Sequence, residues 1–534
     1  MFNNKWNLLT TFGLAVWLGM TLVRLFQCGF VLDDVYLIVN NRWLTEEAGL
    51  GQLLRSDLWA GEVHPDRASG YYRPVFLLSI WLDHYLWGLE PLGYHLHSLF
   101  WQVACGLCAY RLFQNLDLPN AHIATALFLL HPLQTETTYW IVARNDTMAL
   151  SFSLLFLNLW AKPSSIVRDV CGGIILFLAF GSKETAFVIL PLLYLLACGK
   201  RIELGSRRTW IAILIPVLFV FYRISIQPGD VMPPIERWRF LFTHTPKWLT
   251  YMFGKLILPM PLASHMPIHW LSLGWHHFFG VIALLFLIVF TLRHSSRLVF
   301  VIGAVCLCLS IFTVLPPLAQ HGLIGDRYLG FALLGICIWL AALPLNHQLW
   351  MTLIVFPMAF MSVHRGLDWQ TDLHIWKAAH RDYPSSFTDV SLAHIYYNNQ
   401  SYDLAYEHYL AGYSANRPFL NACDVFVVSA LKSKGLLVAN EKGSWALQRG
   451  CKLTGEFAGA MGVVNIGMRE WSAAREMCLI PLSDFYKKKD LVCAAVAYVD
   501  GDLEKIESYR RTWSDQSHFD RQLSALLLSG GLKP

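Results

Sequence analysis

FVLDDVYLIV, Phe30 to Val39, places two adjacent aspartates, Asp33 and Asp34, directly after the first long apolar run of the chain. Apolar residues lie on both sides of the pair, in a place where a carboxylate is costly to keep near hydrocarbon. A single Asp or Asn would be enough to end a membrane segment. The pair therefore indicates chemistry at the point where a first membrane span ends.

Composition predicts that much of the chain lies in a membrane. Of 534 residues, 55% are hydrophobic and 15% are charged, whereas soluble domains carry about 25% charged residues. Long apolar runs recur from Leu8 to Met361 and then stop. We expect a membrane domain over residues 1–363 and a soluble domain over residues 364–534.

About eleven runs are predicted as transmembrane helices, because a helix needs roughly 20 apolar residues to cross a bilayer. The segment from Tyr72 to Leu86 carries Asp83 and His84, and the loop charges obey the positive-inside rule only if it lies along the outer face. The N-terminus is then inside, while a large first loop over residues 30–91 and the soluble domain are outside. The predicted spans begin near Leu8, Leu92, Ala121, Thr147, Val170, Ala186, Trp210, His276, Leu298, Tyr328 and Trp350.

The soluble part has the spacing of a helical repeat. Ala405, Tyr409 and Gly412 follow the small-and-aromatic pattern of a tetratricopeptide repeat, and residues of the same character lie about 34 positions before and after them. The pattern fades after Ala446, and an irregular helical domain with one chance match is the alternative. The predicted fold is all-α: a polytopic helical bundle followed by a tetratricopeptide-like domain.

Cysteines of the membrane part are expected to be small apolar packing residues. The soluble part has an even number of cysteines, which permits disulfides in an oxidising compartment, with three pairings open. These residues are Cys423, Cys451, Cys478 and Cys493.

Charged and polar residues beside the predicted spans collect on the outer side. Each is expensive near a membrane, and each taken alone can be explained by snorkelling or by an ion pair. Their convergence from five loops indicates a shared site instead. The residues are Asp33 and Asp34; Tyr72 and Arg73; His131, Glu136, Arg144 and Asp146; Lys183 and Glu184; and Asp326, Arg327 and Tyr328.

Carboxylates and cations together suit one kind of chemistry at this face. A carboxylate can accept the proton of an attacking hydroxyl, and cations can hold a phosphate leaving group. A donor with its phosphate at headgroup level and its tail in lipid is a polyprenyl-phosphate sugar. We expect Arg73, His131, Arg144, Lys183 and Arg327 to bind the donor phosphate. Supporting or acceptor-side roles are expected for Tyr72, Glu136, Asp146, Glu184, Asp326 and Tyr328.

An ordered set of motifs resembles the GT-C membrane glycosyltransferases, and more specifically the O-mannosyltransferases that join such a domain to tetratricopeptide repeats. The resemblance covers most of the chain to about Gly412. It implies an inverting transfer from a lipid-phosphate sugar to a protein hydroxyl, with Asp33 as the base. We expect Asp34 to orient the loop or a nearby cation. The motifs are FVLDDVYLIVNN, YYRPV, PLGYHLHSLF, HPLQTETTYWIVARNDTMA, SKET, LILPMPLAS, DRYL and HRGLDWQTDLHIWKAAHRDYPSS.

Location and partners follow from the same reasoning. We expect a multi-pass protein of a bacterial inner membrane with its C-terminal domain in the periplasm; an endoplasmic reticulum membrane with a lumenal domain is the alternative. The expected partners are the polyprenyl-phosphate-linked sugar donor, the lipid bilayer, and an exported protein acceptor, such as a pilin or another surface protein, bound by the repeats. No nucleic acid is expected.

No cofactor or metal is expected. Adjacent carboxylates can share a divalent cation, but no reliable short spacing marks such a site outside defined loops. Other functions stay open. A lipid-linked glycan polymerase or ligase would use the same membrane site with a glycan or lipid acceptor. A transporter would place its charges near the bilayer midplane, and an anchored repeat scaffold would leave the convergent charges unexplained.

Overall fold

The structure is a computed structural model that describes residues 2–45, 49–61, 71–226, 250–261, 266–267, 275–293, 301–303, 305–306, 323–342, 348–416, 419–420, 422–480 and 487–532. The chain divides into two compact units, Met1–Ile375 and Trp376–Pro534. Most of the described residues are helical, which confirms the predicted all-α class. One antiparallel pair of two-residue strands, β1 (Met266–Pro267) and β2 (Leu323–Ile324), is the exception.

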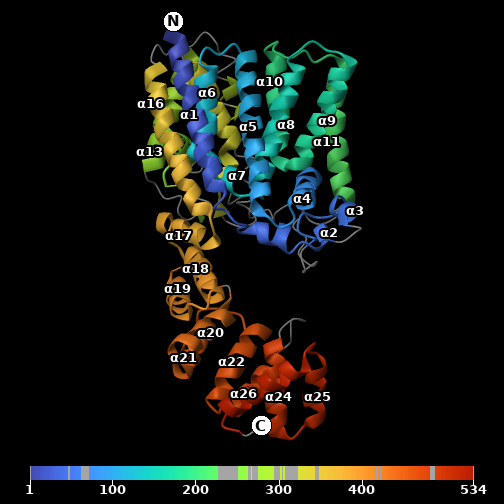
Figure 1. The fold of residues 1–534 in the computed structure, drawn as a ribbon, viewed down its shortest axis with the longest axis vertical. Coiled ribbons are helices and arrows are strands. Elements are labelled where there is room, and N and C mark those ends of the chain that lie inside the picture. The colour runs from blue at the N-terminus through green and yellow to red at the C-terminus, as the bar shows by residue number, and fades with distance from the viewer. Residues whose placement is uncertain are drawn as a thin grey trace. The chain divides into compact units, whose positions relative to one another are not determined.

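Long apolar helices lie side by side in the first unit (Figure 1). Neighbouring pairs are α1 with α16, α5 with α8, α8 with α9, and α9 with α11. The bounds are α1 (Phe2–Leu25), α5 (Pro91–Asn115), α6 (Ala121–Leu130), α8 (Arg144–Trp160), α9 (Ile166–Ser182), α10 (Ile189–Cys198), α11 (Ser206–Ile226), α13 (Trp275–Arg293), α15 (Gly330–Ala342) and α16 (Gln348–Arg365).

These helices lie at the predicted span positions, except the position near Leu298, most of which falls outside the described residues. Among the described helices, only the stretch Ser206–Ser225 is by itself long and apolar enough to cross a membrane. The shortest of these helices, α6 and α10, have 10 residues each, about 15 Å at 1.5 Å per residue, which is less than a span. The number of membrane crossings stays a prediction.

Short elements gather at one end of the long helices (Figure 1). The segment predicted to lie along the outer face is α4, a 14-residue helix. At 1.5 Å per residue it is about 21 Å long, which is less than the roughly 30 Å of a hydrocarbon core. The elements are η1 (Val35–Val39), α2 (Arg42–Thr45), α3 (Gly49–Leu53) and α4 (Pro74–Trp87).

Short turns of helix lie at the ends of several long helices. Two of these turns follow α6 and one precedes α10, while a fourth turn precedes α15 and a fifth follows α16. They position most of the side chains described below. Their bounds are η2 (Pro132–Gln134), α7 (Thr135–Tyr139), η3 (Glu184–Val188), η5 (Asp326–Leu329) and η6 (Gly366–Trp369).

The second unit is a stack of helical hairpins. The first helix of each hairpin packs against its own partner and against the first helix of the next hairpin. The hairpins begin at Ser386, Cys423, Gly455 and Lys487, at intervals of 37, 32 and 32 residues. The bounds are α18 (Ser386–Asn398) with α19 (Tyr402–Ser414), α20 (Cys423–Lys434) with α21 (Leu436–Gln448), α22 (Gly455–Gly467) with α23 (Trp471–Cys478), α24 (Lys487–Asp500) with α25 (Leu503–Arg511), and a final α26 (Gln516–Ser529); α17 (Asp372–Asp382) precedes them.

Hairpins continue beyond the point where the repeat pattern fades in the sequence. Small residues still allow close approach there: a Cβ added to Gly462 would lie 2.5 Å from the side chain of Val492. The positions of these small residues shift from one hairpin to the next, so a fixed repeat template misses them. The intervals support tetratricopeptide-like repeats, whose identity stays a prediction.

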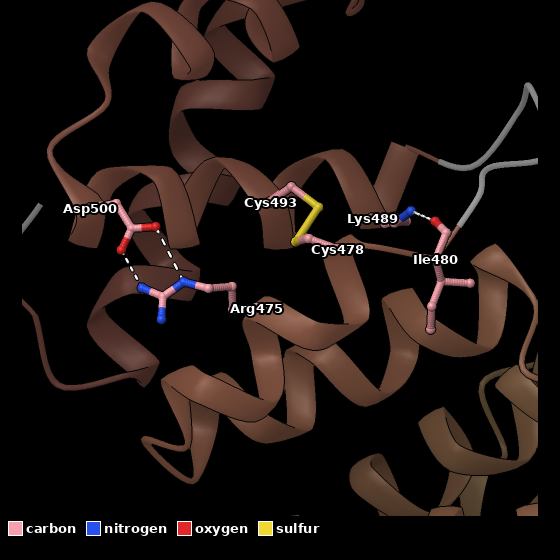
Figure 2. Close-up of a disulfide and its surroundings, with 6 residues drawn as sticks. All are labelled: Arg475, Cys478, Ile480, Lys489, Cys493 and Asp500. Atoms are coloured by element: carbon pink, nitrogen blue, oxygen red, sulfur yellow. Dashed lines mark hydrogen bonds and ion pairs between the residues drawn. A yellow bond between two sulfur atoms is a disulfide. The ribbon is translucent and has the colours of Figure 1, made fainter.

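Two disulfides select one of the three open pairings. Cys423 pairs with Cys451, and Cys478 pairs with Cys493. Figure 2 shows the second bond, which joins the end of α23 to α24. The Lys489 ammonium of α24 also donates to the backbone carbonyl of Ile480, just after α23. Each bond closes a segment that includes the boundary between neighbouring helices.

Candidate active site

The two aspartates of the opening motif have different surroundings. Asp34 is fully buried; its Oδ2 accepts from the backbone N–H of Val31 (3.1 Å) and its Oδ1 from that of Val142 (2.9 Å). Burial raises the pKa of Asp34 well above its ordinary value, and the two backbone donors oppose the rise. Asp33 is only half-buried. Asp34 therefore ties the first loop to the segment before α8, whereas Asp33 is reachable from solvent.

The turn that presents the aspartates is held from two sides. Leu32 adopts a left-handed backbone, with φ of 51°, which is strained for a branched side chain. Its N–H donates to Oδ1 of Asp372 (2.7 Å), and the N–H of Gly29 donates to the carbonyl of Gln370 (3.2 Å). Sequence reasoning assigned no role to Asp372, although this residue lies in one of the quoted motifs. It acts through the backbone of the turn.

Three ion pairs join loops that are far apart in the sequence. Arg73 donates twice to Oε2 of Glu184, from Nε at 3.1 Å and from Nη2 at 3.0 Å. Lys183 pairs with Oδ2 of Asp146 at 2.5 Å. The third pair joins Arg327 in η5 to Glu136 in α7, through its guanidinium and through its backbone N–H at 3.0 Å.

Aromatic rings cover the cations of these pairs. Arg327 lies over the rings of Trp140 (4.8 Å) and Tyr328 (4.5 Å), and Lys183 lies 5.2 Å from the centroid of Tyr328. Arg73 lies over Tyr71 at 4.7 Å. A ring face attracts a cation and excludes water from one side of it. The cations are therefore held in a partly dry layer that an anion could enter.

Electrostatics show that the three pairs form one network. Burial lowers the pKa of Lys183 to about 8; Asp146 opposes this, while Arg73 and Arg327 lower it further. Burial also raises the pKa of Glu136 to about 7, against the effect of Arg327. Both shifts arise because charges are kept close together with little water. We refer to the six paired residues, Arg73, Glu136, Asp146, Lys183, Glu184 and Arg327, as the ion-pair network.

Arg144 lies outside this network. Its side chain is fully buried and donates to Asp83 (2.5 Å), Ser98 (3.0 Å) and the carbonyl of Tyr94 (3.1 Å). His97 completes the cluster by contacting the other oxygen of Asp83 at 2.6 Å. These partners hold the guanidinium apart from the ion-pair network, and the predicted contact of Arg144 with the donor phosphate stays a prediction. The sequence signal was Asp83, a carboxylate within an apolar segment.

Two further predicted residues hold backbone instead. His131 is buried; its Nδ1 accepts from the N–H of Leu133 (3.3 Å) and its Nε2 lies 3.2 Å from the carbonyl of Leu256. Both ring nitrogens thus contact backbone groups, and the predicted contact of His131 with the donor phosphate stays a prediction. The hydroxyl of Tyr72 donates to the carbonyl of Leu54 (2.8 Å) and so fastens the first loop.

The remaining predicted residues border the network. Asp326 is buried at the start of η5 and lies close enough to Glu136 to raise its pKa. The hydroxyl of Tyr328 accepts from Arg327 at 2.7 Å. A small pocket opens beside these residues, between the network and the first turns of α8 and α15. Within the described residues, no group of three His, Cys, Asp or Glu side chains is placed to bind a metal ion.

Comparison with known proteins identifies sequence relatives over part of the chain. No family model matches it. The chain is 33% identical over 128 residues to the human Protein O-mannosyl-transferase TMTC3, covering 24% of this chain and 14% of that protein. It is 32% identical over 187 residues to the human Protein O-mannosyl-transferase TMTC1, covering 34% and 20%. The Drosophila melanogaster Protein O-mannosyl-transferase Tmtc3 is 28% identical over 165 residues, covering 27% and 18%.

These matches confirm the resemblance to O-mannosyltransferases, and they span less than a quarter of the length of each of these three relatives. Among solved structures, the chain is similar to ArnT from Cupriavidus metallidurans bound to undecaprenyl phosphate. The identity is 13%, the coverage is 95% of this chain and 91% of that chain, and the TM-score is 0.42. A likeness at this score supports no conclusion about the chain.

Proposed function

We propose that the chain is a membrane glycosyltransferase of the GT-C type that moves a sugar from a polyprenyl-phosphate donor to a hydroxyl of an exported protein. The observation that carries the proposal is the ion-pair network, in which three aromatic-covered cations lie at loops linked to the aspartate turn. The link is the segment from Glu136 to Asp146: its Val142 N–H holds Asp34, and both its ends belong to the network. The names of the sequence relatives supply the reaction class.

Asp33 is proposed as the general base. It would accept the proton of the acceptor hydroxyl while that oxygen bonds to the anomeric carbon of the sugar. The bond from that carbon to the donor phosphate breaks on the opposite face, and its electron pair leaves with the phosphate, so the configuration inverts. Asp34 is proposed to position Asp33, since both of its oxygens are occupied by backbone N–H groups.

The cations of the network are proposed to bind the donor phosphate. Lys183 and Arg73 would exchange part of their contact with Asp146 and Glu184 for contact with phosphate oxygens. Charge-assisted hydrogen bonds to phosphate are stronger than neutral ones, and a low-dielectric site strengthens them further. The proposal needs no metal, because the cations themselves neutralise the charge that develops on the leaving phosphate.

A membrane location is proposed from the surface of α11. Its outward side carries large apolar residues at helical spacing, all well exposed: Trp210, Ile213, Leu214, Val217, Leu218 and Phe221. A continuous apolar stripe of this kind marks an interaction surface, and lipid is the simplest partner for a helix of this length. The lipid would also carry the tail of the donor.

The hairpin unit is proposed to lie on the outer side, in the periplasm or in an endoplasmic reticulum lumen, and to bind the acceptor protein. Its disulfides support an oxidising compartment, because such bonds are rare where thiols are kept reduced. Stacked hairpins also present an extended surface suited to a protein or peptide.

Replacing Asp33 tests the proposal directly. Asp33→Asn keeps the shape of the side chain but removes its basicity, and should lower the transfer rate by about 10²–10⁴. Mass spectrometry of exported proteins, with the gene deleted and then restored as the parent or the variant, should show a hexose-sized modification that Asp33→Asn fails to restore. Asp117→Asn, at an exposed aspartate paired with Arg201, is the matched control. Restoration by Asp33→Asn at the parental level would contradict the proposal.

A further inference from the structure

A pocket beside the ion-pair network is lined by two residues of the network, Asp146 and Arg327, and by further polar side chains that the phosphate chemistry leaves unused. Gln134 of η2 and Thr137 of α7 form one side, and Asp146 and Thr147 at the start of α8 form another. Thr185 of η3 and Arg327 and Tyr328 of η5 complete the polar lining, and apolar side chains of α8 and α15 close the pocket. The pocket is small, so it suits one edge of a ligand.

Gln134 has donors without acceptors. Its side chain is 4% exposed, and its Oε1 accepts from the Thr137 hydroxyl at 3.2 Å. This bond orients the amide, and Nε2 has no hydrogen-bond partner in the described part of the chain. A buried polar group without a partner is destabilising, because it has lost its hydrogen bonds to water. Two N–H groups of a pocket residue are thus left to donate to a ligand.

Asp146 supplies the complementary acceptor. Its Oδ2 receives Lys183, whereas no hydrogen bond within the described residues engages its Oδ1. Thr147 donates its hydroxyl proton to the carbonyl of Arg144 at 3.0 Å, so its oxygen keeps lone pairs that can accept. The pocket therefore offers amide donors on one side and oxygen acceptors on the other.

The charges of the lining decide what fits: the guanidinium of Arg327 is paired with Glu136, whereas Asp146 presents a carboxylate oxygen to the pocket. A carboxylate oxygen facing the pocket repels a phosphate, so the anionic part of a donor belongs at the cations instead. A neutral group with hydroxyls can donate to Asp146 and accept from Gln134 at the same time. The ring of Tyr328 and the side chain of Phe331 line the same pocket, which suits the C–H face of a pyranose. Few but well-placed polar groups in an apolar cavity are typical of small-molecule sites.

We propose that this pocket binds hydroxyl groups of the sugar that is transferred, and so contributes to the choice of sugar. The inference rests on the proposed function and deepens it: the phosphate lies at the cations, and the sugar edge lies between Gln134 and Asp146. Replacing the amide of Gln134 should then weaken binding of a sugar-bearing lipid and leave binding of a bare lipid phosphate unchanged.

The test compares two lipids on the full-length protein. The probes are a polyprenyl-phosphate mannose and the same polyprenyl phosphate without sugar, with affinities measured in detergent. Gln134→Met keeps the length of the side chain and removes its donors. We expect a loss of about 3- to 10-fold for the mannose lipid, as for one net hydrogen bond, and none for the bare lipid. Thr185→Val changes a half-buried pocket residue and should lower the affinity for the mannose lipid by a smaller factor, again without affecting the bare lipid. This variant serves as the test if Gln134→Met folds poorly.

The matched control is a buried glutamine that lies outside the pocket. Gln102 in α5 is fully buried, and its amide also has no partner in the described part of the chain, yet it does not line the pocket. Gln102→Met should leave the preference between the two lipids unchanged. Equal losses for both lipids in Gln134→Met and Thr185→Val, or no loss in either, would overturn the pocket inference while the parent still transfers sugar. A parent that binds neither lipid and transfers nothing would overturn the proposed function as well.

Discussion

Two ion pairs, one in each unit, differ in how far water reaches them. In the first unit, the side chains of Arg144 and Asp83 are 0% and 2% exposed. In the second unit, those of Arg475 and Asp500 are 52% and 41% exposed (Figure 2). A buried charge depends on its partner, because breaking the pair leaves an uncompensated charge, whereas an exposed charge is solvated with or without one. The same residue types are therefore essential for stability in the buried pair and minor contributors in the exposed one.

The cysteines show a related difference. Every described cysteine of the first unit is unpaired, and the four of the second unit form two disulfides. The second unit divides its core into separate clusters, one over the hairpins from Val390 to Val464 and one over those from Ile466 to Leu527. Small cores gain most from covalent links. The comparison predicts that charge changes damage the first unit most, and that thiol changes damage the second.

The largest effect is expected from Arg144→Met. The substitution leaves Asp83 buried without its cation and should lower the free energy of unfolding by about 3–5 kcal/mol. Reversible unfolding in mixed detergent measures the change. Adding Asp83→Leu should recover most of the loss, since it removes the uncompensated charge. A single variant as stable as the parent would mean that water or another cation reaches Asp83.

Loss of the second disulfide should cost somewhat less and should act only on the hairpin unit. The bonded residues are 15 positions apart, and closing a loop of that size is worth about 3 kcal/mol. In the double variant Cys478→Ser with Cys493→Ser, amide hydrogen exchange should become faster in α23 and α24. The exchange rates of the first unit should stay unchanged. Cys171→Ser, at an exposed free cysteine of the first unit, is the control and should change nothing. Uniform exchange through both units would contradict the separation.

Lys183 should give the proposed site a pH dependence of about tenfold. Burial lowers its pKa from 10.5 to about 8, so above pH 8 the amine loses its charge and binding of a phosphate donor should weaken. Lys183→Arg should hold the affinity constant to higher pH, because a guanidinium stays protonated. Donor affinity measured across this range for both proteins checks the difference, and coinciding profiles would exclude Lys183 from the phosphate site.

The same shift affects stability with a defined sign. Between pH 8 and 10.5 the unfolded state binds the Lys183 proton more than the folded state does, so this group's contribution to the free energy of unfolding rises with pH in that window. In Lys183→Met the rise should be absent.

The smallest effect is expected from Arg475→Met, the same substitution as in Arg144→Met but at a solvated pair. Exposed ion pairs contribute about 0.2–1 kcal/mol, so the stability of the hairpin unit should change by no more than that. A loss comparable to that of Arg144→Met would break the proposed contrast between the units.

The sequence predicted the positions of the helices well, but it did not predict which side chains pair with one another. Apolar runs place the helices because burial and periodicity are local properties, and the described helices lie at the predicted positions. Arg144 and Arg73 look alike in sequence, since each is a cation beside a predicted span. Only packing distinguishes them: Arg144 meets Asp83 across 61 positions, and Arg73 meets Glu184 across 111.

The sequence alone determined the all-helical class, the resemblance to O-mannosyltransferases, and the unusual position of the Asp33 and Asp83 carboxylates among apolar residues. Composition and the cost of a charge among apolar residues can be read from neighbouring positions. Tertiary structure alone decided that Asp34 holds the N–H of Val142, that Lys183 pairs with Asp146, and which cysteines are joined. Contacts of this kind depend on where distant segments meet, and one sequence carries no direct record of those distances.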